Sequence, residues 1–181
     1  MQTTLKTTLI AAALLSSSLA FSATMSKADH SAAKDRISVD YKAAKKACDT
    51  NSGNAKDICV EQAKGVEKVA LADLQFQFSG KSADATKLAI AKSDAAYAVA
   101  KEMCDDKAGN DKDVCVKEAK AAHTKGVTDA KMSKEIHAAV VDANETKRNA
   151  DYKVAAEKCD ALAGDAKTGC VNTAKAKFGQ K

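Results

Sequence analysis

The sequence predicts an all-α protein built of three tandem antiparallel helical hairpins, each clipped by one disulfide. Three observations support this prediction. The chain of 181 residues contains no proline and is rich in alanine and lysine, which favour helix. A turn bracketed by two cysteines occurs three times. On both sides of each turn, apolar residues recur at steps of three and four, the spacing of one helical face.

Residues 1–22 are expected to be an export signal. Lys6 supplies a positive charge, and residues 9–20 form an apolar run that is too short to span a bilayer. Small residues favour cleavage near Ser22, with a second candidate site at Ala20 and an uncleaved anchor as the alternative. Such a signal predicts a periplasmic protein, in an oxidising space where an even number of cysteines tends to pair.

The rest of the chain repeats with a period of 55 to 56 residues, as the spacing of Cys48, Cys104 and Cys159 shows. Such a period indicates one supersecondary unit used several times. We place the three hairpins at 23–80, 81–131 and 132–181. Helices are expected near 27–50, 55–78, 82–107, 111–161 and 166–178, with a break at 126–133 left open. The choice between a compact bundle and an elongated row of hairpins also stays open.

Each turn carries residues that are typical of helix ends. A glycine in each copy is expected to take the left-handed conformation and end the first helix: Gly53, Gly109 and Gly164. The residue that follows it is expected to cap the second helix: Asn54, Asn110 and Asp165. Because one helix stops and the next starts within about two to four residues, the two helices must be antiparallel.

The two cysteines of each turn are equally distant from its midpoint and face the seam between the helices. We therefore expect pairing within each hairpin: Cys48 with Cys59, Cys104 with Cys115 and Cys159 with Cys170. Closing such a 12-residue loop stabilises the fold by about 3 kcal/mol. Since aromatic residues make up only 4% of the chain, these disulfides are expected to replace a bulky core.

No enzymatic site is predicted. The sequence has no phosphate-binding glycine loop and no nucleophile motif. The cysteine spacing favours structural disulfides over redox or zinc sites, so we expect no metal and no cofactor. The three histidines are expected to be solvated helix residues: His30, His123 and His137. The net charge of +5 is spread over 29 basic and 24 acidic residues, which argues against nucleic-acid binding.

The units at 41–64 and 97–123 share the pattern Y-x6-C-D-x3-G-N-x-K-D-x-C-V. They resemble the units of small exported alanine- and lysine-rich proteins of Gram-negative bacteria, particularly β-proteobacteria. These proteins are often labelled TolA-like proteins of cell envelope biogenesis, and the likeness to TolA lies in the composition of its central helical region. The resemblance covers most of the chain after the signal and implies a periplasmic helical protein.

The repeats and the lack of a catalytic constellation predict a non-enzymatic structural or interaction protein of the cell envelope. Its expected partner is an envelope protein, peptidoglycan or a membrane surface, contacted through long helical faces of mixed charge. The alternative is a stress-related periplasmic holdase that binds unfolded proteins. The oligomeric state is not predicted.

Overall fold

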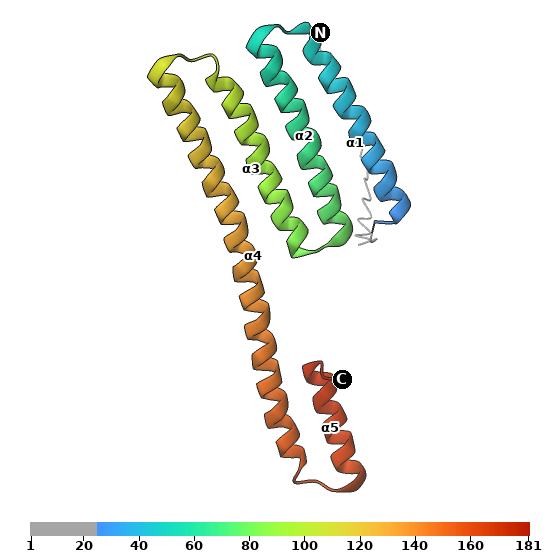
Figure 1. Cartoon of the computed structure of the whole chain (residues 1–181). Helices are drawn as coiled ribbons and strands as arrows, with labels where there is room; N and C mark the ends of the chain where they lie inside the picture. The colour runs from blue at the N-terminus through green and yellow to red at the C-terminus, as the bar shows by residue number, and fades with distance from the viewer. Residues whose placement is uncertain (1–24) are drawn as a thin grey trace, which may run out of the picture.

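The computed structural model describes residues 25–181, which form helices joined by short turns. The elements are α1 (Lys27–Ala47), η1 (Cys48–Thr50), α2 (Gly53–Ser79), α3 (Ser82–Cys104), α4 (Gly109–Cys159) and α5 (Gly164–Phe178) (Figure 1). The predicted all-α fold of three disulfide-clipped hairpins is confirmed. The export signal expected at 1–22 lies outside the described residues. In the part that the structure describes, no helix has both the length and the hydropathy to cross a membrane.

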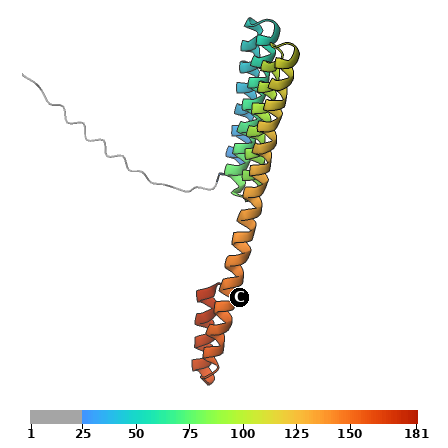
Figure 2. The ribbon, with the colours of Figure 1, turned by 90° about the vertical axis from the view of Figure 1, so that its left-hand side faces the viewer.

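The first four α-helices stand side by side in one row (Figure 1). Among the described helices α1–α5, each α-helix contacts only its neighbours in the chain. Figure 2 shows the row nearly edge-on. A single row leaves two faces open to solvent, so the buried side chains are few and are mostly alanine, leucine and cysteine. The protein is thus an elongated row and not a compact bundle.

The seam between α2 and α3 includes a very close approach of the two backbones. A Cβ atom added to Gly65 would lie 2.9 Å from the Cβ of Ala95, which is closer than carbon atoms of packed side chains come. Glycine at this position and alanine opposite it therefore allow the two helices to approach.

The chain folds back between α2 and α3 at Gly80. This residue has a φ of 62°, and its N–H donates to the carbonyl oxygen of Phe76 at 2.8 Å, which ends α2. Asp84, in the first turn of α3, is buried and holds the turn by accepting hydrogen bonds from Lys87 Nζ at 2.8 Å and Ser79 Oγ at 2.7 Å. These two bonds, that to Lys87 first, lower the pKa of the Asp84 carboxyl from 3.8 to about 2.

α4 does not fold back in this way. It runs unbroken through 126–133, and the expected boundary between the second and third hairpins at 131/132 lies inside it. With the cysteines aligned, the place of Gly80 is taken in α4 by Glu135 or Ile136. Because neither residue favours a positive φ, the helix continues and carries the third hairpin away from the row (Figures 1 and 2).

Replacing Gly65 with alanine is expected to destabilise the α2–α3 seam by about 1–3 kcal/mol, because the added methyl group overlaps Ala95. Gly169 in α5 is the matched control, since nothing lies within 4 Å of its added Cβ. Gly169→Ala should stabilise α5 by up to about 1 kcal/mol through helix propensity. Backbone hydrogen exchange measures both effects, each in its own helix. Stabilisation by both substitutions would contradict the close approach of α2 and α3.

The Asp84 carboxylate makes stability depend on acid pH. Because its folded-state pKa of about 2 lies below the unfolded value, its contribution is full above about pH 4 and is lost as the pH falls towards 2. Asp84→Asn removes this contribution at every pH. The thermal midpoints of the wild type and the variant should therefore differ near neutral pH and converge in acid. A difference that stayed constant down to about pH 2 would show that ionisation of Asp84 is irrelevant.

Candidate functional site

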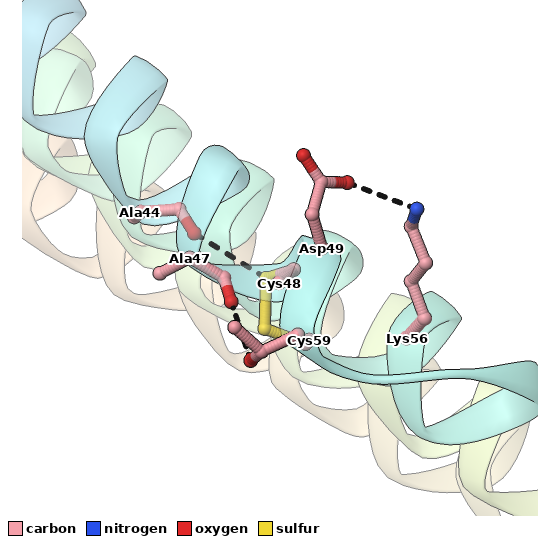
Figure 3. Close-up of a disulfide and its surroundings, with 7 residues drawn as sticks. Ala44, Ala47, Cys48, Asp49, Lys56 and Cys59 are labelled. Atoms are coloured by element: carbon pink, nitrogen blue, oxygen red, sulfur yellow. Dashed lines mark hydrogen bonds and ion pairs between the residues drawn. A yellow bond between two sulfur atoms is a disulfide. The ribbon is translucent and has the colours of Figure 1, made fainter.

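Each hairpin turn is closed by a disulfide. The predicted pairings are confirmed: Cys48–Cys59, Cys104–Cys115 and Cys159–Cys170, with Cα–Cα distances of 5.6, 5.7 and 5.7 Å. These separations are ordinary for a disulfide. In each pair the first cysteine is buried and the second is half-buried. Figure 3 shows the first turn, where Cys48 Sγ lies 3.4 Å from the carbonyl oxygen of Ala44.

An ion pair spans each turn beside its disulfide. The aspartate that follows the first cysteine pairs at 2.9 Å with the lysine three residues before the second: Asp49–Lys56, Asp105–Lys112 and Asp160–Lys167 (Figure 3 shows the first). These side chains are exposed, so each pair contributes at most about 1 kcal/mol. These pairs were not predicted from the sequence, although Asp and Lys recur at fixed offsets from the cysteines in all three copies.

The structure corrects the predicted capping of the second helix. The turn glycines are left-handed as predicted, with φ of 57°, 54° and 55°: Gly53, Gly109 and Gly164. However, they begin the second helix instead of ending the first. The N-cap positions are Ser52, Ala108 and Ala163, and no side chain caps these helices. The capping roles predicted for Asn54, Asn110 and Asp165 are wrong, because an N-cap must precede the helix and these are its second residues.

Asn54 has a different contact, which ties the first hairpin to the second. Its Nδ2 donates to the carbonyl oxygen of Glu102 at 2.8 Å, near the end of α3. The same oxygen also accepts the backbone N–H of Asp105 at 3.0 Å, so the Asn54 amide adds a second hydrogen bond to a carbonyl at the end of α3. The two turns lie at the same end of the row, which makes the contact possible (Figure 1).

One face of the row carries a polar connection across three helices. Asp94 of α3 binds Lys68 of α2 at 2.7 Å and His123 Nε2 of α4 at 2.6 Å. These hydrogen bonds, that to Lys68 first, lower the pKa of the Asp94 carboxyl. The ring of His123 also lies 5.0 Å from that of Tyr97, centroid to centroid. We call the side of the row that bears Asp94 the polar face.

The histidine prediction is therefore partly wrong. His123 is half-buried in the α3–α4 seam, and the ring of His30 lies 4.5 Å from that of Phe78. Only His137 is the exposed helix residue that was expected. Both packed histidines meet residues that are distant in the sequence, so no local pattern indicated these contacts.

The other side of the row carries three adjoining grooves. The largest, about 760 Å³, runs between α2 and α3. It shares Val66 and Ala70 with the groove between α1 and α2, and it shares Lys92, Ala96 and Ala100 with the groove between α3 and α4. Because neighbouring grooves share their walls, they form one continuous surface. We call it the apolar face.

The apolar face lies opposite the polar face. Ala96 and Val66 each stand two positions from a residue of the polar connection, Asp94 and Lys68, and two positions on a helix turn the side chain by about 200°. Val66 is 71% exposed and Met103, also in the largest groove, is 53% exposed. Exposed apolar surface of this kind is common at interaction sites, which makes the apolar face a candidate site.

The apolar face was not predicted from the sequence. Its signal was weak, because alanine occurs on every side of these helices. Valine and methionine could have shown it, since Val99 and Met103 recur at a helical step, as do Val66 and Val69.

Within residues 25–181, no group of three or more histidine, cysteine, aspartate or glutamate side chains is placed to hold a metal ion. Comparisons with protein-family models, curated proteins and solved structures find no match to this chain. The apolar face and the disulfide-closed turns are therefore the features on which a functional proposal rests.

The third disulfide is expected to matter most for local structure, because α5 contacts only α4. Replacing Cys159 and Cys170 with serine removes about 3 kcal/mol and should leave α5 unprotected from hydrogen exchange, while α1–α3 stay protected. The same change at Cys104 and Cys115 is the control, because α3 keeps its contacts with both α2 and α4. Retained protection of α5 without its disulfide would contradict this role.

Proposed function

We propose that the chain is an exported, non-enzymatic interaction protein of the cell envelope, which binds an amphipathic helix of a partner protein on its apolar face. The three disulfides suit an oxidising compartment such as the periplasm, in line with the export signal expected at 1–22. The observation that carries the proposal is the continuous apolar surface over α1–α4.

The shape of this surface favours a helix as its occupant. The largest groove lies between two antiparallel helices, and its lining includes the small residues Gly65, Ala95 and Ala96. Small residues let another backbone approach closely, while Val69 and Val99 offer apolar contact on either side. A third helix laid in the groove would convert the α2–α3 pair into a three-helix unit with a covered core.

The other expected partners fit this surface less well. Peptidoglycan is polar and would leave the valine and methionine side chains without apolar contact. A membrane's hydrocarbon region gives no partner to the charged residues Asp73 and Lys92, which lie in the lining of the largest groove. A protein helix can fill the groove and place its own polar residues beside these charges.

The holdase alternative also has an observation in its favour. The grooves are shallow, and the largest is lined by the exposed Val66 and by Met103, whose flexible side chain can adapt to different sequences. Unfolded chains would use the same apolar face, but they would bind without a defined partner or a fixed orientation.

A photo-crosslinker placed at Ala96 in cells tests the proposal, with Ala83 as the control. Both residues lie on α3 and are exposed, but Ala83 is on the side of the polar face. We expect one discrete protein adduct from position 96 and none from position 83. Val66→Glu, which puts a charge on the apolar face, should abolish the adduct while helicity by circular dichroism stays unchanged.

Other outcomes decide between the two functions. Many weak adducts from position 96, together with suppressed aggregation of a denatured client that Val66→Glu abolishes, would favour the holdase. Equal adducts from both positions, or none from either, would contradict binding on the apolar face.

A further inference from the structure

α4 has one side that no other described helix covers. Among α1–α5, its first part contacts only α3 and its last part only α5. Both neighbours lie on the same side of α4 (Figure 1), so the opposite side is free along the whole helix. Between the two contacts, every residue of 131–151 is exposed. This stretch includes Met132, Ile136 and Val140, which are 50%, 56% and 53% exposed.

The chain itself contains a template for covering this side. With the cysteines aligned, the first half of α4 corresponds to α2 and its second half to α3. α2 and α3 are folded onto each other at Gly80, whereas the two halves of α4 are held apart by an unbroken helix. The surfaces that form the α2–α3 seam therefore have counterparts in α4 that lack a partner within the chain.

These counterparts form one exposed stripe, which we call the free stripe. Gly65 and Ala95, the residues of closest approach, correspond to Ala121 and Ala150. The stripe continues between them at helical spacing and contains Ala121, Thr128, Met132, Ala139, Ala143 and Ala150, all of them exposed. Its positions are symmetric about the bond between residues 135 and 136, because they derive from the two arms of one hairpin.

We propose that a second copy of this chain covers the free stripe, with the two α4 helices antiparallel. A two-fold axis passes between Glu135 and Ile136, so each position meets its mirror position. Ala121 then faces Ala150 of the second copy, and because Ala121 stands where α2 has Gly65, the two α4 helices pack farther apart here than α2 and α3 do. In effect the two copies exchange their third hairpins. Beyond the first half of its own α4, each row is extended by the second half of α4 and by α5 of the other copy.

The charges of α4 support the antiparallel direction. Residues 125–134 contain three lysines and one aspartate, a net charge of +2, whereas residues 137–146 contain one aspartate and one glutamate, a net charge of −2. The proposed symmetry places these two segments opposite each other. It brings Lys131 beside Asp142 of the second copy, because these two residues lie on the same flank of α4. A parallel pairing in register would place like charges together.

The extent of the interface also favours this pairing. The two-fold axis generates the counterpart of the α2–α3 seam twice, once on each side of residues 135 and 136. The interface is therefore about twice as long as the α2–α3 seam, which is stable within one chain. An interface of this extent suits a stable dimer better than a transient contact.

Sedimentation equilibrium of the oxidised chain tests the proposal, and we expect a dimer. Ala143→Arg places a long charged side chain on the free stripe and should shift the protein to monomer. Val141→Arg is the matched control, because residue 141 is also exposed but lies two positions away, on the opposite side of α4. Since both sites are exposed in the single chain, circular dichroism should show unchanged helicity.

A charge exchange tests the direction. Lys131→Glu and Asp142→Lys should each weaken the dimer about tenfold, since each loses two symmetry-related pairs, and the double variant should restore it. A wild-type monomer up to the solubility limit would overturn the proposal. A dimer that resists Ala143→Arg, or a double variant weaker than either single one, would also overturn it.

Discussion

The covalent closure of each turn is the constraint on which this structure depends. Helices made largely of alanine bury little area when they pair, and a pair of short helices is marginal in water. A disulfide removes much of the entropy of the open chain, so the two arms stay together although their seam is thin. Its effect is local, because each bond joins cysteines 11 positions apart and fixes only its own hairpin. The arrangement of hairpins relative to one another must come from other contacts.

Those contacts are few and specific, and they explain why the row has two unlike faces. Asn54 joins two turns, and Asp94 joins α2, α3 and α4 from the polar face. With the polar contacts on one side, the other side keeps its valine, alanine and methionine uncovered. A compact bundle would have buried this apolar face in its core. A row exposes it, so the feature that limits stability also supplies a surface for binding.

The sequence predicted what lies within one hairpin and missed what lies between hairpins. Helix limits and the cysteine pairing follow from spacing along 20 to 30 residues, as in the unit from Tyr41 to Lys64, where local pattern determines geometry. The Asn54–Glu102 bond and the Asp94 connection join residues 26 to 48 positions apart and depend on how the helices are ordered side by side. The capping prediction failed for a local reason: a left-handed glycine can stand on either side of a helix boundary.

One position separates a closed hairpin from an open helix. Gly80 reverses the chain after α2, whereas Glu135 and Ile136 let α4 continue, although the flanking units are copies of one another. The free stripe of α4 is related to the apolar face through the third hairpin. The groove between α4 and α5 is lined by Val154 and Ala155, which correspond to Val99 and Ala100 of the largest groove. If a second copy extends each row through α4, these grooves continue the apolar face across the exchanged hairpin. Self-association would thus lengthen the binding surface. Replacing Glu135 or Ile136 with glycine would favour a monomer in which α4 folds back on itself, and the binding surface of this monomer would be shorter.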